Sequence, residues 1–474
     1  MKNTFDFLKT ASLSLQGVLR SHYKKSSLLA VCFFLFSCDS FVEVGLPGSQ
    51  LTGEAVFEDT VTATAAMAGL YAKMRDNGLL AGNATGASCY LGLYTDEFDY
   101  FQQNAVSTFY NNALFAGEPG VSDIWNQSYN QIYSANAIMQ GVSHCASLPE
   151  AQKKQLRGEV LFIRALLHFY LLNLYGDIPY ITTTDYKQNS TVSRMPADRV
   201  YGLIVEDLNE AIGLLSEDYV SPERTRPNRS AARALLARVY LYTGSYAQAA
   251  NAASAVINST LYAWETDLDK IFLKESSTTI WQFMPNAPGV NTAEGDLYLF
   301  EGGPPPIVGL NPNFVDAFEP NDQRKVHWTR AVTDGTTTWY MACKYKQESS
   351  TAGSVEHSIV FRLAEQYLIR AEARAYQGDL IGAKEDLNLI RTTAGLASIS
   401  AVTAEDIIAD ILHQRRFELF TEFGQRFFDL KRTGTLNQTL SLSKPGWNAT
   451  DALWPLPALE LGANPNLNPQ NPGY

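Results

Sequence analysis

The sequence predicts a mainly α-helical protein in which helical hairpins form a scaffold and a loop-rich lobe with short strands is inserted between them. Apolar residues recur at helical spacing in the stretch 361–395, and the same pattern occurs again near residue 240. Helical spacing is lost between residues 262 and 358, where short alternating runs and Gly-Pro turns take over.

The stretch 361–395 predicts one helical hairpin. Apolar side chains fall at three-and-four spacing, which places them on one face of a helix: Leu363, Tyr367, Leu368 and Ala371. Gly378 follows, and glycine readily takes the positive φ that ends a helix. Asp379 is placed to accept hydrogen bonds from the first free amides of the next helix.

A second segment repeats this pattern in register. Ala237, Gly244 and Ala249 have the same spacing as Ala371, Gly378 and Ala383, and Ser245 stands in the N-cap place of Asp379. Small residues twelve apart, with glycine at the seventh step, are typical of tetratricopeptide repeats, in which the alanines let paired helices approach closely. Because one hairpin cannot bury its own apolar face, we expect such units to stack.

The start of the chain is interpreted as a targeting segment. Lys24 and Lys25 precede the apolar run 26–37, which is too short to span a membrane but typical of a secretory signal. The run ends in Leu-Phe-Ser before Cys38, as in a bacterial lipobox, so we expect cleavage before Cys38 and lipid attachment to its thiol. This predicts a signal peptide at 1–37 and a lipidated tether at 38–56; the alternative is a short hydrophobic start followed by an ordinary cysteine.

The chain after the signal peptide is strongly acidic. Residues 1–37 contain five Lys or Arg and one Asp, which leaves 32 basic and 48 acidic residues and a net charge of −16. Such a surface disfavours nucleic acid and is not attracted to anionic lipid, so the lipid chains must provide the anchoring. Cys89, Cys145 and Cys343 are widely spaced, which predicts buried thiols, although one pair could bridge.

Helical spacing predicts an N-terminal helical region over 57–261, with helices at 57–75, 125–142, 156–175, 199–215, 230–243 and 246–258. The helix at 156–175 is apolar on nearly all sides, so we expect it at the centre of the fold. The segment 77–115 is rich in Gly, Asn and aromatic residues and is expected to be an irregular binding loop.

The inserted lobe is expected at 262–358, with strands at 279–283 and 338–341. The C-terminal region, 359–474, is expected to contain the second hairpin, a helix at 403–423 that begins with a capping box of Thr403 and Asp406, and a tail that its prolines keep extended.

No catalytic signature is present: the sequence lacks a nucleophile elbow, a zinc-protease motif, a P-loop and a dinucleotide-binding glycine run. Glu418 and Glu422 could serve as acid and base in glycoside hydrolysis, but that chemistry needs carboxyl groups on opposite sides of a sugar. Both lie on one predicted helix beside Arg415, Arg416 and Arg426, which favours a buried salt-bridge network under phenylalanines. His168 is interpreted as a core residue, and no metal or cofactor site is predicted.

Two regions combine flat aromatic rings, which stack on the apolar faces of pyranoses, with polar side chains that bind hydroxyl groups. The first holds Tyr94, Asp96, Tyr100, Phe101 and Asn104, and the second holds Trp328, Arg330, Trp339 and Tyr340, with Trp281 less favoured. We expect Trp339 and Tyr340 to be the more exposed pair. The alternative for each ring is a place in the core, because most aromatic side chains are buried.

Four motifs stand in a fixed order along the chain. They are Arg164-Ala165 with the run 175–179, the run 370–391, the run 415–432, and the ending Asn471-Pro472-Gly473-Tyr474. Together with the lipobox they resemble the SusD/RagB family over nearly the whole mature chain. His413-Gln414, where an acidic residue often stands, and Thr392-Thr393 depart from the family pattern.

The resemblance implies an outer-membrane lipoprotein that faces the exterior and has tetratricopeptide-like helices. It implies a non-catalytic role: the protein captures nutrient, most often oligosaccharide and sometimes peptide, above a TonB-dependent channel of the SusC type. It also implies that the first ring-bearing region binds glycan. The alternatives from the residues themselves are a helical glycoside hydrolase and a repeat scaffold for a protein partner.

Overall fold

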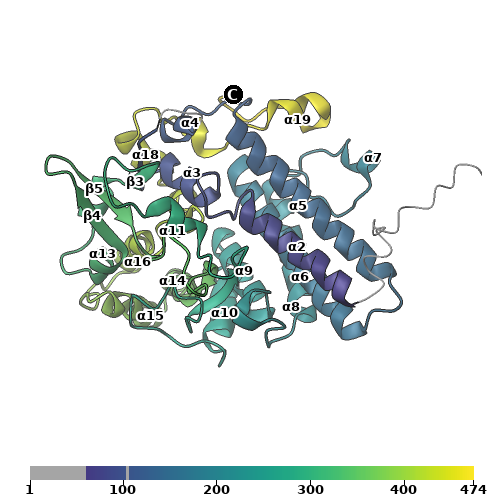
Figure 1. The fold of residues 1–474 in the computed structure, drawn as a ribbon, viewed down its shortest axis with the longest axis horizontal. Helices are drawn as coiled ribbons and strands as arrows, with labels where there is room; N and C mark the ends of the chain where they lie inside the picture. Colours follow the sequence, from purple (N-terminus) through teal and green to yellow (C-terminus); the bar gives the residue numbers. More distant parts are fainter. Residues whose placement is uncertain (1–59, 103–105) are drawn as a thin grey trace, which may run out of the picture. The chain divides into compact units, whose positions relative to one another are not determined.

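The computed structural model describes residues 60–102 and 106–474, and most of these residues are helical (Figure 1). The predicted signal peptide 1–37, the tether 38–56, the proposed lipidation site Cys38 and the proposed ligand residue Asn104 lie outside the described residues. The boundaries expected between the N-terminal region, the inserted lobe and the C-terminal region stay predictions.

One long helix forms the centre of the N-terminal region. In α6 (Glu150–Tyr175) every residue from 158 to 175 is buried, as its apolar faces predict. It packs between α5 (Pro119–His144) and α8 (Ala197–Leu214), while α2 (Thr60–Asp76) lies alongside α5 (Figure 1). The short helices α7 (Tyr186–Asn189) and η3 (Pro222–Arg224) lie in the connections that follow α6 and α8.

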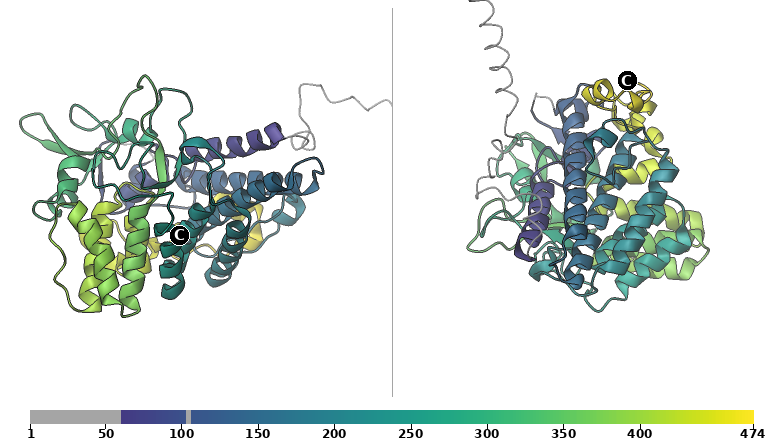
Figure 2. Two further views of the ribbon diagram at one scale, coloured as in Figure 1. Left: turned by 90° about the horizontal axis from the view of Figure 1, so that it is seen from below. Right: turned by 90° about the vertical axis from the view of Figure 1, so that its right-hand side faces the viewer.

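The two predicted hairpins form and lie side by side. The first consists of α9 (Arg229–Tyr242) and α10 (Tyr246–Ile257), and the second of α14 (Leu363–Tyr376) and α15 (Leu380–Thr393). Helix α10 packs on α14, and α16 (Ala404–Glu418) extends the stack (Figure 2). Gly244 and Gly378 have φ values of 69° and 84°, the positive angles expected where each first helix ends.

Small side chains make the close packing of the hairpins possible. Ala237 and Ala249 join Ile369 and Ala373 in one buried cluster between the two hairpins. The Asp379 side chain accepts a hydrogen bond from the Gly382 amide at 3.0 Å, as predicted. Ser245 occupies the corresponding N-cap position, as predicted, although its side chain makes no capping hydrogen bond.

The described strands form two small sheets. A four-stranded sheet has the order β1 (Phe98–Tyr100), β3 (Val308–Leu310), β5 (Thr338–Ala342) and β4 (Thr329–Thr333). A two-stranded sheet pairs β2 (Thr279–Phe283) with β6 (Ser358–Arg362). Strands β2 and β5 confirm the strands predicted at 279–283 and 338–341. The helices α11 (Ala293–Tyr298), α12 (Pro312–Asp316) and α13 (Gln323–Trp328) lie between these strands along the chain.

The prediction of an irregular loop at 77–115 is wrong in part. The segment contains α3 (Ala87–Tyr94), strand β1 and α4 (Ser107–Tyr110). Every residue of α3 is buried, so the helix has no polar face and its sequence shows no amphipathic period.

The C-terminal region also departs from expectation. Helix α16 ends at Glu418 rather than at residue 423, because Thr421 and Phe423 adopt positive φ angles before α17 (Gln425–Arg432) begins. Thr403 caps α16 as predicted, accepting from the Asp406 amide. Helix α18 (Leu436–Ser443) follows, and the tail is only partly extended, because it contains η4 (Ala449–Ala452), α19 (Ala458–Ala463) and η5 (Pro465–Leu467).

The last residues fasten the tail to the end of the central helix. The Asn471 side chain donates to the carbonyl oxygens of Tyr175 and Trp454, both at 2.7 Å. Its own oxygen accepts from Arg194 at 2.6 Å. The terminal motif therefore holds together α6, the connection after it and the chain end, which Figure 1 places close to the start of α5.

Candidate ligand-binding surface

The four-stranded sheet brings the two predicted ring-bearing regions together. Strand β1 carries Tyr100, and strand β5 carries Trp339 and Tyr340. In the register, Asp99 lies opposite Gly309, and Leu310 in turn lies opposite Tyr340. The pairing continues past β1, because the Phe101 amide donates to the carbonyl of Ile307 at 3.0 Å.

Successive residues of a strand point to opposite faces of a sheet, and this divides the predicted residues into two groups. Tyr100 and Tyr340 share the face that packs against the main core, and both are half-buried. Phe101, Arg330 and Trp339 belong to the opposite face. Trp339 and Tyr340, expected to be the more exposed pair, are both half-buried, whereas Phe101 is 37% exposed.

Gly303 lets the Trp339 ring of this outer face lie close to the backbone, whereas a Cβ atom at Gly309 would make only ordinary van der Waals contact with Phe101. A Cβ atom at Gly303 would lie 2.0 Å from Cε3 of Trp339, and one at Gly309 would lie 3.4 Å from Cε2 of Phe101. Phe101 is 37% exposed, and Trp339 is half-buried. In the sequence, the run 302–306 indicates only an interruption between strands. Nothing in its pattern predicts that Gly303 lies against the Trp339 ring.

Three predicted or considered aromatic residues belong to the core instead. Tyr94, Trp281 and Trp328 are buried, with exposures of 0%. Tyr94 packs edge-on against Phe427 and Trp454, and the Trp328 indole donates to a backbone carbonyl at 3.1 Å. The ligand-binding role predicted for Tyr94 and Trp328 is contradicted, because no face of either ring is accessible.

Asp96 is part of an ion-pair cluster rather than a free polar group. Its carboxylate accepts two hydrogen bonds from Arg426 and one from Arg416, each at 2.9 Å. Burial by itself raises the pKa of Asp96, but the two arginines lower it below its usual value. The side chain therefore connects the segment after α3 to the C-terminal helices.

Glu418 and Glu422 form the buried network that the sequence favours, but with other partners. Glu418 accepts from Arg362 at 2.6 Å and from Arg324 at 3.2 Å, and Glu422 accepts from Arg362 and Lys344. These cations come from the inserted lobe and β6. The predicted partners, on α16 and α17, bond elsewhere: Arg415 pairs with Asp429, and both Arg416 and Arg426 pair with Asp96. Glu418 is 4% exposed and does not reach a ligand surface.

His168 is a core residue, as interpreted. Its Nδ1 lies 2.8 Å from the Arg164 carbonyl oxygen, and its Nε2 accepts from the Ile181 amide at 3.1 Å. Burial lowers the pKa of His168 to about 3, so the ring is neutral and donates through Nδ1. Across residues 60–102 and 106–474, no group of three His, Cys, Asp or Glu side chains is arranged to hold a metal ion.

Cys89, Cys145 and Cys343 are unbridged, and two of them are buried as expected. Cys145 is half-exposed, so the prediction of buried thiols fails there. Within the part of the chain that the structure describes, no helix has the length and apolar character needed to cross a membrane.

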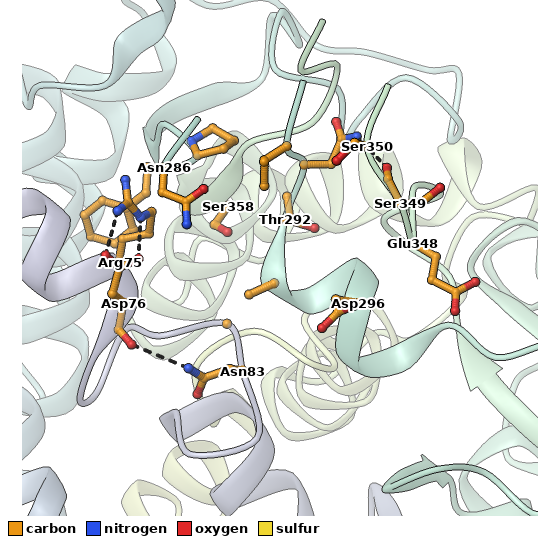
Figure 3. A pocket seen from close by; sticks show the side chains of 16 residues that line it. Arg75, Asp76, Asn83, Asn286, Thr292, Asp296, Glu348, Ser349, Ser350 and Ser358 are labelled. Carbon is orange, nitrogen blue, oxygen red and sulfur yellow. Dashed lines mark hydrogen bonds and ion pairs between the residues drawn. The ribbon is translucent and has the colours of Figure 1, made fainter. Parts of the chain in front are cut away.

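A polar cavity of about 500 Å³ lies beside α2 and α11 (Figure 3). Arg75 and Asp76 line one side and are paired with each other at 2.6 Å. Thr292 and Asp296 come from the start of α11, and Glu348 from the loop on the far side (Figure 3). The cavity offers hydrogen-bonding groups but little stacking surface.

Two family models match separate parts of the chain. A model described as "Starch-binding associating with outer membrane" matches residues 55–241, and one described as "SusD family" matches residues 324–451. This chain belongs to the SusD family. Across 95% of its length, this SusD-family protein is 27% identical to a SusD-like protein of Formosa agariphila, 99% of which is covered.

Other relatives agree with this assignment. The starch-binding protein SusD of Bacteroides thetaiotaomicron is 26% identical over 69% of this chain and 74% of its own length. A SusD superfamily structure from Bacteroides vulgatus matches with a TM-score of 0.76 and 23% identity, covering 88% of this chain and 99% of the other. A laminarin-binding SusD-like protein matches with a TM-score of 0.75 and 24% identity, and the match covers 88% of this chain and 100% of that protein. These structures confirm the predicted helical scaffold with a small strand lobe.

Proposed function

We propose that this SusD-family protein is a non-catalytic binding protein that captures oligosaccharide on the outer face of its four-stranded sheet. The observation that carries the proposal is that Phe101 shares this face with Arg330 and Trp339, which lie on a hairpin far along the sequence from it. Phe101 is exposed and Trp339 is half-buried, so both rings keep accessible apolar surface, and the exposed Arg330 guanidinium on the same face can donate hydrogen bonds.

The relatives support a glucan as the first ligand to test. One is named for binding starch and another for binding laminarin, and the matching family model is described as starch-binding. Peptide, which the family resemblance also allows, is the comparison ligand. The binding experiment decides which glucan is bound.

The test is calorimetric titration of the purified protein with maltooligosaccharides, laminarioligosaccharides and peptides. Trp339→Ala is expected to weaken glucan binding by about 10-fold, the effect of losing one stacked ring. Tyr376→Ala is the matched control, because Tyr376 is an exposed ring on the hairpin stack. Equal loss in both variants, or binding of peptide alone, would contradict the proposal.

The non-catalytic part of the proposal is supported by the burial of Glu418 between Arg324 and Arg362. Incubation of the protein with the bound glucan is expected to release no reducing ends, and Glu418→Gln is expected to leave glucan affinity unchanged. Turnover that disappears in Glu418→Gln would instead establish the hydrolase alternative.

Delivery and anchoring complete the proposal. We propose that lipid chains on Cys38 hold the protein on the exterior of the outer membrane, where it passes ligand to a SusC-like TonB-dependent transporter. The expected results are incorporation of labelled palmitate that is lost in Cys38→Ser, and co-purification with a large β-barrel protein. Recovery of a soluble partner without a barrel would favour the protein-scaffold alternative.

A further inference from the structure

A second cavity, of about 400 Å³, lies between α5, the loop that carries α7, and the tail around α19 (Figure 1). Its aromatic lining consists of Trp125, Tyr129 and Tyr133. None of the strands of the four-stranded sheet contributes to it. The sequence reasoning did not select these residues, although rings at every fourth position of a predicted helix were a visible signal.

The three rings form a row along one face of α5. A spacing of four residues places side chains one above the other on a helix. The ring centroids of Trp125 and Tyr129 are 4.8 Å apart, and the Tyr129 hydroxyl donates to the Pro179 carbonyl at 2.9 Å, which fixes its ring. Tyr133, at the open end of the row, is 49% exposed.

The walls of the cavity are bonded to one another. Asn136 of α5 donates to the Ile181 carbonyl at 3.0 Å, which holds the loop to the helix. Asn464 and Asn466 of the tail donate to the carbonyls of Val192 and Thr191, both at 2.8 Å. Because these contacts exist without a ligand, binding in the cavity orders few additional groups.

The polar side chains at the cavity are amides, hydroxyls and one carboxylate, Glu460. Neither Glu460 nor Asn126 makes a side-chain hydrogen bond to another residue in the described part of the chain. The Asn189 amide oxygen is buried and has no partner among the described residues. Arg194, a nearby cation, already donates to three oxygen atoms of other residues.

We infer that this cavity is a second carbohydrate site that takes a neutral pyranose unit. The half-buried Tyr129 and the exposed Tyr133 offer ring surface to the apolar C–H face of a pyranose, and Trp125 lies buried beside them with 3% of its surface exposed. Glu460 and Asn126 are placed to accept hydrogens from the hydroxyl groups of the sugar. The uncompensated Glu460 carboxylate disfavours uronic or sulfated sugars. The cavity volume lies within the ordinary range for small-ligand sites. The inference shares the ligand class of the proposed function, but it concerns a separate surface.

The experiment uses the full purified protein with fluorinated tryptophan, so that each indole gives its own fluorine resonance. Trp125→Phe and Trp339→Phe assign the two reporter signals. Maltotriose, laminaritriose, glucuronate and choline are the probes. With a neutral trisaccharide we expect the Trp125 signal to shift in the wild type and still to shift in Trp339→Ala, in which the sheet surface is impaired.

Tyr133→Ala is expected to weaken the response of Trp125 by about 10-fold and to leave the response of Trp339 unchanged. Tyr186→Ala is the control, since Tyr186 is an exposed ring on α7 that does not line the cavity. A Trp339 shift without a Trp125 shift overturns this inference and leaves the proposed function standing. A Trp125 shift without a Trp339 shift overturns the proposed function and leaves this inference standing. A response of Trp125 to choline or glucuronate, but not to either trisaccharide, overturns the inference.

Discussion

Arg238 and Glu365 form a bidentate ion pair inside the protein, although they are 127 residues apart in the chain. Nε of Arg238 lies 2.6 Å and its second terminal nitrogen 2.7 Å from the two carboxylate oxygens, and both side chains are 3% exposed. The pair joins α9 to α14, so it connects the first predicted hairpin to the second across the inserted lobe.

Removing one partner of this pair should be far more damaging than removing both. Arg238→Met leaves the Glu365 carboxylate buried without its main partner and is expected to lower the free energy of unfolding by about 3–5 kcal/mol. In the double variant Arg238→Met/Glu365→Leu most of that loss should be recovered, because no buried charge remains. Urea denaturation of the three proteins measures the difference, and an additive double variant would contradict this account.

Gly303 should be required for ligand binding but not for folding. The Cβ of Gly303→Ala must displace the Trp339 ring, because it would lie 2.0 Å from Cε3. We expect glucan affinity to fall about as far as in Trp339→Ala, roughly 10-fold, with a small change in stability. Gly302→Ala is the control, since no atom lies within 4 Å of its added Cβ. Calorimetry measures the glucan affinity of both variants, and equal affinities of Gly303→Ala and Gly302→Ala would contradict the role of Gly303.

Glu97 should make the protein less stable as the pH rises. Burial and the neighbouring Asp96 raise the pKa of Glu97 from 4.5 to about 7. Between these values the folded protein retains a proton that the unfolded chain releases, so stability falls by roughly 3 kcal/mol as the pH increases through this window. Below this pH window Glu97 is protonated in both the folded and the unfolded state, so it does not make stability depend on pH.

The variant Glu97→Gln stays uncharged, so it is expected to be more stable than the wild type at about pH 8 and equally stable at about pH 4.5. Urea denaturation at both values of pH measures this difference. The control is Glu348→Gln at an exposed glutamate, which should keep the pH dependence of the wild type. Parallel pH profiles for wild type and Glu97→Gln would show that Glu97 is not responsible.

The terminal motif should stabilise the whole helical region. Asn471→Ala leaves the carbonyls of Tyr175 and Trp454 without their donor and is expected to cost about 2–4 kcal/mol. Asn466→Ala, which removes one exposed hydrogen bond of the same tail, should cost less than about 1 kcal/mol. Chemical denaturation compares the two, together with protease cleavage of the tail. Similar losses for both asparagines would contradict the special role of Asn471.

Local patterns determined much of this fold. Apolar spacing predicted α6 and both hairpins, because a helix that buries one face must repeat apolar residues every three or four positions. Gly378 and Asp379 marked a hairpin turn through backbone chemistry that acts within a few residues. Helix α3 was not predicted, because a helix that is buried on all sides shows no periodic alternation of apolar and polar residues.

Tertiary structure alone decided which side chains meet. The sequence offered two ring-bearing regions, but strand register assigned Phe101, Arg330 and Trp339 to the outer face and turned Tyr100 and Tyr340 towards the core. Likewise, Glu418 forms ion pairs with Arg362 of β6 and Arg324 of the inserted lobe rather than with arginines of its own helix. Such contacts depend on long-range packing between segments that have no periodic relationship in sequence, so local pattern carries no information about them.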